Sequence, residues 1–129
     1  MSAISKLAQI AITVSNVSVA LGFYRDILGL NLLFSPSDNL AFLSCGDTRV
    51  MLTTPQGYGE IGKNSIMYFS VKDIETTFGK MLDKGAELER FPQLSANMPD
   101  HELWIGFLKD PDGNLIGLME EKSLKNTGI

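Results

Sequence analysis

Apolar and polar residues alternate along residues 9–14, where every second side chain is a large aliphatic one. This period of two is typical of a half-buried strand. The period changes after Ser15 and Asn16, and apolar residues then recur at helical spacing over residues 17–28. Either of the two polar residues can cap the start of a helix, and Gly29 is a natural stop. The pattern therefore predicts a strand followed by an amphipathic helix.

Three short strands are predicted after the helix, at residues 31–34, 40–44 and 49–53. A turn is predicted between the first two of them, at residues 35–38. The glycine-rich residues 55–64 then form a linker. Strand-like alternation returns at residues 66–71, and a second helix is expected between Asp73 and Gly85. The last strands are expected near residues 87–91, 103–108 and 115–119. Residues 92–100, which contain two prolines, are expected to form a lid beside a cleft.

The two halves of the chain repeat one order of elements: strand, helix, strand, strand, strand. A shift of 57 residues places Val14 on Val71, Asn16 on Asp73, Val17 on Ile74, Leu21 on Phe78 and Gly22 on Gly79. A repeated order together with its caps indicates an internal repeat. We therefore expect an α+β fold in which residues 1–129 form one domain. Module one would span about residues 1–57 and module two about residues 58–129, each with a curved sheet backed by one helix.

Composition narrows the class of function. The 129 residues are 44% hydrophobic and 20% charged, which suits one compact folded domain. Fifteen acidic residues against eleven basic ones give a net charge of −4, and the sequence has no basic run. Binding to nucleic acid or to anionic lipid is therefore not expected. The apolar runs are far shorter than the roughly 20 residues of a membrane span, so no membrane partner is expected either.

The chain has one cysteine, Cys45, and one histidine, His101. This excludes an internal disulfide, a cysteine-rich zinc site and a multi-histidine metal centre. A reducing, cytoplasmic location is the default for such a sequence, and residues 1–15 are too polar for a secretory signal. Cys45 has no histidine or basic cluster near it in sequence, so a structural role is favoured over that of a nucleophile.

Two segments carry a resemblance to a known family. They are LGFYRDILGL at residues 21–30 and FLKDPDGNLIGLMEE at residues 107–121. Together with the repeated element order, they resemble the vicinal oxygen chelate (VOC) superfamily, which includes glyoxalase I, bleomycin-resistance proteins and extradiol dioxygenases. The resemblance covers roughly residues 7–121. It implies two βαβββ modules whose curved mixed sheets surround a cleft, the glyoxalase/bleomycin resistance fold.

The resemblance also implies where a metal centre would lie. In the metal-using members, four inward side chains from the first and last strands of the modules bind one divalent ion. The matching positions here are Gln9, Met51, Ile66 and Gly117, with Leu52 as a one-residue alternative to Met51. Isoleucine and glycine have no donor side chain, and a thioether is a poor ligand for the usual metals. We therefore expect no metal and no other cofactor.

The same assignment orients each strand, because side chains two residues apart share a face. In the strand over residues 103–108, the odd-numbered positions form the apolar set and are assigned to the core, so that Glu102, Trp104 and Gly106 face the cleft. The expected ligand-binding residues are Gln9, Thr13, Arg49, Met51, Ile66, Tyr68, Ser70, Glu102, Trp104 and Gly117. A mostly apolar lining with two aromatic faces is typical of small-molecule pockets.

Glu102 and His101 are the candidates for catalysis. Glu102 in an apolar cleft would have a raised pKa and could act as a base, or it could pair with Arg49. His101 could act as an acid or base near neutral pH, although a loop histidine without a catalytic role is the simpler interpretation. Asp110 and Asp112 are explained by a type I turn.

Three functions stay open at this level. The first is a metal-free protein that binds or sequesters a small apolar or aromatic compound, as the resemblance to bleomycin-resistance-like members implies. The alternative is a glyoxalase-related lyase or isomerase, or another enzyme that uses Glu102 or His101 rather than the usual metal centre. The third is a protein-interaction module with a vestigial cleft. A homodimer is expected, because family members commonly pair and two-fold pairing is the commonest assembly.

Overall fold

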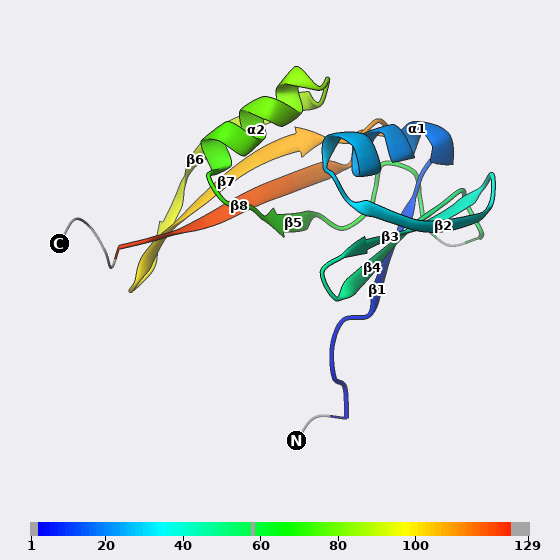
Figure 1. The fold of residues 1–129 in the computed structure, drawn as a ribbon, viewed down its shortest axis with the longest axis horizontal. Helices are drawn as coiled ribbons and strands as arrows, with labels where there is room; N and C mark the ends of the chain where they lie inside the picture. Colours follow the sequence, from blue (N-terminus) through cyan, green and yellow to red (C-terminus); the bar gives the residue numbers. More distant parts are fainter. Residues whose placement is uncertain (1–2, 58, 125–129) are drawn as a thin grey trace. The chain divides into compact units, whose positions relative to one another are not determined.

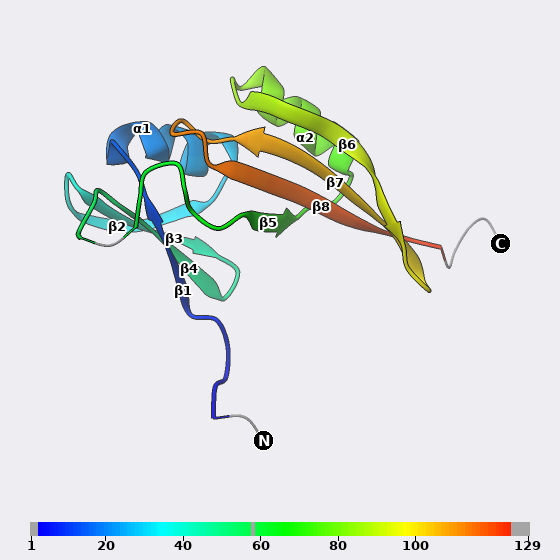
Figure 2. The same ribbon diagram turned by 180° about the vertical axis from the view of Figure 1, so that it is seen from behind.

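A computed structural model describes residues 3–57 and 59–124 of the chain. The chain divides into two compact units, Met1–Asn64 and Ser65–Ile129, which we call unit 1 and unit 2. Each unit contains one four-stranded sheet with a helical segment on one of its faces (Figure 1, and from behind in Figure 2).

Unit 1 begins with strand β1 (Gln9–Thr13), followed by helix α1 (Val17–Leu21) and a π-helix, η1 (Gly22–Ile27). Its sheet is completed by β2 (Asn31–Ser37), β3 (Leu40–Cys45) and β4 (Thr48–Thr53). The strand order is β1-β4-β3-β2. β1 runs parallel to β4, and the other neighbouring strands are antiparallel.

Unit 2 contains β5 (Met67–Ser70), helix α2 (Ile74–Asp83), β6 (Glu87–Asn97), β7 (His101–Lys109) and β8 (Leu115–Ser123). The strand order is β5-β8-β7-β6, with β5 parallel to β8 and the other neighbouring strands antiparallel. Both units therefore have the βαβββ order, and the α+β fold class expected from the sequence is confirmed.

Both helices begin at a side-chain cap. At the start of α1, Asn16 Oδ1 accepts a hydrogen bond from the backbone N–H of Val19 at 2.9 Å. At the start of α2, Asp73 has a left-handed backbone (φ 49°) and accepts a hydrogen bond from the N–H of Thr76 at 3.5 Å. Such caps satisfy backbone donors that have no partner inside the helix. The two capping residues are related by the 57-residue shift, so the repeat includes how each helix begins.

Each hydrophobic core lies mainly between a sheet and its helix. The buried apolar residues of unit 1 are Ile12, Val14, Val17, Ala20, Phe23, Tyr24, Ala41, Leu43, Val50 and Leu52. Those of unit 2 are Ile74, Phe78, Met81, Phe107, Leu108, Ile116 and Leu118. The set includes Ile12 and Val14, which belong to the apolar side of the half-buried strand predicted at residues 9–14.

The prediction of one α-helix over residues 17–28 is wrong beyond Leu21. The backbone widens there into a π-helix, in which the N–H of Leu28 donates to the carbonyl of Phe23 at 2.9 Å, five residues earlier. Two neighbouring aromatic side chains of the π-helix, Phe23 and Tyr24, are only 3% and 0% exposed. Their rings meet edge to face, with 5.0 Å between centres. Within the described residues, no helix has the length and apolar content needed to cross a membrane.

Two strands are longer than the sequence pattern predicts. β2 extends to Ser37, so the turn predicted at residues 35–38 is wrong; the last residue of β2 pairs with the first of β3. β6 extends to Asn97, so the lid predicted at residues 92–100 is wrong as well. Pro92 is accommodated because β6 lies at the edge of its sheet and its pairing with β7 shifts register around the proline.

Candidate functional site

The sheet face of unit 1 that points away from its helix, which we call its open face, carries two of the positions assigned to metal ligands. The register pairs Gln9 with Arg49 and Ala11 with Met51. Arg49 Nε donates a hydrogen bond to Gln9 Oε1 at 2.6 Å, and Gln9 Nε2 lies 3.8 Å from Met51 Sδ. The structure thus brings together three residues that the sequence placed on one face. The amide oxygen of Gln9 is engaged by a cation.

An aromatic pair that the sequence analysis missed lies beside these residues. Phe42 of β3 is opposite Met51 in the register, and its ring stacks on that of Phe34 with 5.1 Å between centres. The guanidinium carbon of Arg49 lies 5.2 Å from the centre of the Phe42 ring. The period-two pattern of β3 could have placed Phe42 on this face, because Ala41 and Leu43 occupy the buried one.

Thr13, another expected ligand contact, is covered by the glycine-rich segment. The side-chain amide of Asn64 brackets its backbone: Oδ1 accepts from the Thr13 N–H at 3.2 Å, and Nδ2 donates to the Thr13 carbonyl at 3.3 Å. A Cβ atom on Gly59 would lie 2.5 Å from Thr13 Oγ1, so only glycine permits this approach. Thr13 is 5% exposed and serves to hold this segment against β1.

The open face of unit 2, defined in the same way, is aromatic. The register aligns Tyr68, Gly117 and Phe107 in one row, and Ser70 lies opposite Met119 in the next row on the same face. The rings of Tyr68 and Phe107 meet edge to face, with 5.9 Å between centres. A Cβ atom on Gly117 would lie 2.6 Å from Tyr68 Cδ1. The space beside Gly117 is therefore filled by the ring of Tyr68.

The predicted direction of three β7 residues, Glu102, Trp104 and Gly106, is wrong. A Cβ atom on Gly106 would lie 2.8 Å from Cε1 of Phe78 in α2, so Gly106 faces the helix. Trp104 shares this helix-covered face, and its ring centre lies 4.5 Å from Nζ of Lys122. Trp104 Nε1 donates to Glu102 Oε1 at 3.0 Å, which gives the glutamate a structural partner.

The error has a physical reason. Both faces of β7 carry large apolar side chains, so alternation alone does not distinguish the core face from the open one. The deciding contact is made with another element: glycine at position 106 leaves room for Phe78 of α2, whereas Phe107 packs against Tyr68.

His101 lies on the open face of unit 2, in alternation with Phe107. Its Nδ1 is 2.7 Å from Asp100 Oδ1, and its Nε2 is 3.8 Å from Glu121 Oε2. The hydrogen bond with His101 lowers the pKa of the Asp100 carboxyl. Of the two catalytic candidates, the structure therefore leaves His101, and not Glu102, on the face of Tyr68.

A cavity of about 340 Å³ lies on the open face of unit 2. It is lined by Tyr68, Arg90, Gln93, Leu94, Ser95, Ile105 and Phe107. Sequence reasoning missed Arg90, because the pairing of β6 with β7 shifts register on both sides of it and breaks the alternation. The following Pro92 is the one local signal of such an irregularity.

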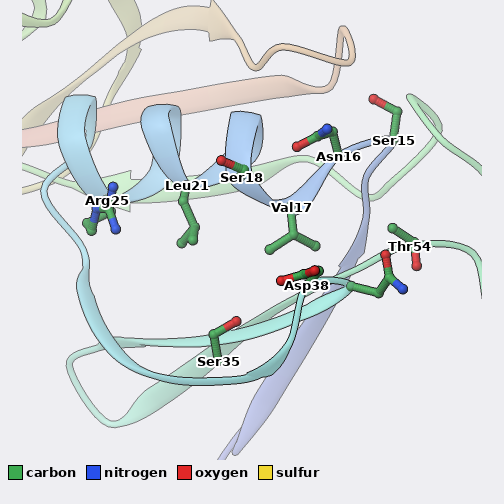
Figure 3. A pocket seen from close by; sticks show the side chains of 10 residues that line it. Ser15, Asn16, Val17, Ser18, Leu21, Arg25, Ser35, Asp38 and Thr54 are labelled. Atoms are coloured by element: carbon green, nitrogen blue, oxygen red, sulfur yellow. The ribbon is translucent and has the colours of Figure 1, made fainter.

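A second cavity, of about 410 Å³, lies in unit 1 between the start of α1 and the β2–β3 hairpin (Figure 3). Its lining is largely polar and consists of Ser15, Asn16, Val17, Ser18, Leu21, Arg25, Ser35, Asp38, Asn39 and Thr54. Arg25 already pairs with Asp26, with 2.8 Å between Nε and Oδ1, and this hydrogen bond raises the pKa of Arg25. None of the residues expected to bind a ligand lines this cavity.

The residues at the four positions assigned to metal ligands do not fit a divalent ion. Ile66 and Gly117 have no donor atom, and Met51 offers only a thioether. The remaining candidate, Gln9, already accepts a hydrogen bond from the cationic Arg49, whose charge opposes a nearby metal ion. Within the described residues, no group of three or more His, Cys, Asp or Glu side chains is arranged to hold a metal.

The turn after β7 is structural, as predicted. Asp110 Oδ1 accepts hydrogen bonds from the N–H groups of Asp112 at 3.0 Å and Asn114 at 2.8 Å. Asn114 Nδ2 also donates to Asp110 Oδ2 at 2.8 Å. Cys45 is half-buried at the end of β3.

Comparison with known proteins connects this fold to one superfamily. The family model of the Glyoxalase/Bleomycin resistance protein/Dioxygenase superfamily matches residues 6–118. A protein from Synechocystis sp., named "Probable lactoylglutathione lyase", is 32% identical, and the alignment covers 93% of this chain and 98% of that protein.

Two solved structures have the same fold. A lactoylglutathione lyase from Agrobacterium tumefaciens superposes with a TM-score of 0.77 at 21% identity, covering 91% of this chain and 94% of that one. TnmS3, an antibiotic binding protein from Streptomyces sp. CB03234, superposes with a TM-score of 0.74 at 22% identity, covering 95% of this chain and all of that one. At these identities the likeness concerns the fold alone.

Proposed function

This chain belongs to the Glyoxalase/Bleomycin resistance protein/Dioxygenase superfamily, and on that premise we propose that it binds a small apolar or aromatic molecule without a divalent metal ion. The observation that carries the proposal is the position of Tyr68. Its ring fills the space beside Gly117, so an apolar surface lies where the family resemblance assigns a metal ligand. The antibiotic-binding protein TnmS3 supports a binding role, because it is a structural relative of this chain.

The open face of unit 1 supports the same role. Phe34 and Phe42 form a stacked pair, and Arg49 and Gln9 hold one another by a hydrogen bond. Apolar and aromatic surface supplies most of the affinity for a small ligand, and a few polar groups orient it.

The metal-free character is tested by elemental analysis of dialysed protein and by thermal-shift screening of a small-molecule library with and without EDTA. A ligand that binds the folded state raises the unfolding temperature, and the shift grows with ligand concentration. We expect the shifts to be the same in both conditions. One stoichiometric ion per chain that survives dialysis, or a ligand shift that EDTA abolishes, would contradict the proposal.

The aromatic surface is tested by Tyr68→Ala. Removal of a ligand-contacting ring should weaken binding of a screened ligand by roughly tenfold, because large aromatic contacts dominate such sites. Trp104→Phe is the matched control, since Trp104 lies on the helix-covered face and its loss should leave the dissociation constant unchanged. The reverse result, with binding sensitive to Trp104 and insensitive to Tyr68, would place the ligand elsewhere.

A second candidate is a lyase or isomerase that uses His101. It is favoured by the name of the Synechocystis relative and by the placement of His101 between the carboxylates of Asp100 and Glu121. Formation or cleavage of lactoylglutathione by the purified protein, lost in His101→Gln and retained in Glu102→Gln, would favour this function. No turnover in metal-supplemented and metal-free buffer would leave binding as the function.

We also propose that the chain forms a homodimer. The edge strand β2 exposes Leu33 and Phe34 to 49% and 55%, and an exposed apolar edge is a surface on which chains associate. Light scattering should give a mass near twice 14.1 kDa. Phe34→Glu should shift the mass toward one chain; a wild-type protein that stays monomeric at all concentrations would contradict the dimer.

A further inference from the structure

Arg90 is placed on the open face of unit 2 by an irregular stretch of strand. The pairing of β6 with β7 shifts register on both sides of Arg90, which lies opposite Phe107. Such bulges re-aim a side chain and are frequent near functional sites. The guanidinium carbon lies 5.1 Å from the centre of the Phe107 ring. Arg90 is thus held over an aromatic ring inside the cavity that Tyr68 also lines.

The charge of Arg90 forms no ion pair with the described part of unit 2. The two nearest acidic residues along β6, Glu87 and Glu89, lie 3.9 Å and 3.4 Å from Lys109 Nζ and are paired with that lysine. By contrast, each of the other two arginines of the chain donates a hydrogen bond to a neighbouring side chain. The hydrogen-bond donors of Arg90, an exposed residue, are therefore open to solvent and to a bound group.

The geometry suits a ligand that is both aromatic and anionic. A guanidinium over a ring uses its flat face, whereas its five N–H donors lie in its plane and match the two oxygens of a carboxylate. Tyr68 and Phe107 provide an aromatic surface beside this cation. The cavity of about 340 Å³ lies within the roughly 300–1,000 Å³ range of small-molecule pockets.

We propose that the chain prefers an aromatic carboxylate to a neutral aromatic compound, with Arg90 binding the carboxylate while the ligand ring packs against Tyr68 and Phe107. This proposal rests on the proposed function and names the ligand class of the same open face. The apolar contact supplies affinity, and the ion pair supplies discrimination. Arg90 then determines the specificity of the site, because its side chain, and not a metal ion, binds the carboxylate of the ligand.

The test compares 2-naphthoate with 2-naphthamide, which share a ring and nearly a shape but differ in charge. Calorimetric titrations at neutral pH use the full chain as wild type, Arg90→Gln, Arg90→Lys and Arg25→Gln. The wild type should bind the carboxylate roughly three- to tenfold more tightly, the range expected of one charge-assisted contact that solvent partly screens. Arg90→Gln should lose this preference and bind the amide as the wild type does.

The other two variants separate charge from geometry. Arg90→Lys keeps the charge without the planar fork and should retain part of the preference. Arg25→Gln removes an arginine that already pairs with Asp26, and it should leave the preference unchanged. Thermal unfolding of each variant establishes that it is folded; if Arg90→Gln does not fold, Arg90→Lys decides, and a full wild-type preference there overturns the inference.

Two further outcomes distinguish this inference from the proposed function. Equal affinity of the wild type for both compounds, or an undiminished preference in Arg90→Gln, overturns the inference and leaves aromatic binding in place. Binding of neither compound to the wild type up to its solubility limit overturns the aromatic site as well as the inference.

Discussion

Units 1 and 2 build the same strand order but fill the space under their helices differently. On the helix-covered face of unit 1, one row of paired residues is Ile12, Leu52 and Ala41. The corresponding row of unit 2 is Phe69, Leu118 and Gly106. Unit 1 covers its row with a helix that widens from α to π, and unit 2 with a continuous α-helix. Phe69 of unit 2 is larger than Ile12 of unit 1, and Gly106 is smaller than Ala41. The larger side chain is therefore balanced by the smaller one, as close packing of both cores requires.

The open faces of the two units differ in chemistry. In unit 1, Arg49 donates to Gln9 on a neighbouring strand. In unit 2, Arg90 lies over the ring of Phe107, and we propose that it binds the carboxylate of a ligand. The repeated topology thus supplies two similar sheets, whereas the side chains on their open faces decide what each can bind.

The largest expected effect concerns the aromatic core under the π-helix. Tyr24→Ala should lower the free energy of unfolding by about 3–5 kcal/mol, because a fully buried ring is replaced by a cavity. Met81→Ala, at the position in unit 2 related by the 57-residue shift, should cost about 2–3 kcal/mol. Urea denaturation measures both. Equal losses would show that the π-helix gives Tyr24 no packing advantage.

The contact between Gly106 and Phe78 distinguishes the core of unit 2. Gly106→Ala should cost about 1–3 kcal/mol, since the new Cβ would lie 2.8 Å from the Phe78 ring and 3.0 Å from the Pro92 backbone nitrogen. Adding Phe78→Leu should recover part of the loss, because this places in unit 2 the alanine and leucine found at the matching positions of unit 1. A neutral Gly106→Ala would mean that β7 faces the other way.

Gly22 and Gly79 occupy matching helical positions, and a Cβ atom on either would meet nothing within 4 Å. Gly79→Ala, inside α2, should stabilise the protein by about 0.5–1 kcal/mol, because alanine restricts the unfolded chain and favours the helix. Gly22→Ala should have the same sign and a smaller size, since Gly22 lies where α1 changes into η1. Thermal unfolding tests the pair; a destabilising Gly22→Ala would show that the π-helix requires glycine there.

The smallest expected effect is the pH dependence of the ion pair between α2 and β8 in unit 2. Lys122 Nζ donates to Glu75 Oε2 at 2.8 Å, and this hydrogen bond lowers the pKa of Glu75. A carboxyl whose pKa is lower in the folded state stabilises that state above its unfolded pKa, and the contribution is lost as the pH falls through the folded pKa. Because the pair is largely exposed, its contribution at neutral pH should be only a few tenths of a kcal/mol.

Glu75→Gln should therefore differ from the wild type at neutral pH and converge with it in acid, as measured by urea titrations across pH. Glu60→Gln, which removes a loop pair with Lys63 in unit 1, is the control and should show no measurable difference. A wild-type advantage over Glu75→Gln that persists unchanged at low pH would contradict the assignment.

Much of the fold followed from local patterns. The alternation in β1 and β5 and the caps at Asn16 and Asp73 are properties of neighbouring residues, and the structure contains them where the sequence placed them. The Gln9 and Met51 positions also share a face as predicted, because β1 and β4 each have one clearly more apolar side.

The sites that sequence reasoning missed lie where local patterns are ambiguous or broken. Arg90 sits between two register shifts, so counting by two from its neighbours does not give its direction. The π-helix replaces the α-helical period that the spacing of residues 17–28 suggested. Both features depend on which partner segment is packed alongside.

Residue type and short-range spacing are enough to infer the order of the elements, the helix caps, the family resemblance and the lack of donor atoms in the side chains at positions 66 and 117. Only the tertiary structure decided that Trp104 turns toward α2 and that Phe107, Tyr68 and Arg90 meet on the opposite face. β7 has apolar side chains on both faces, so the alternation does not decide which face turns toward α2. The volume of the side chains decides it, because the ring of Phe78 fits against β7 where Gly106 has no side chain.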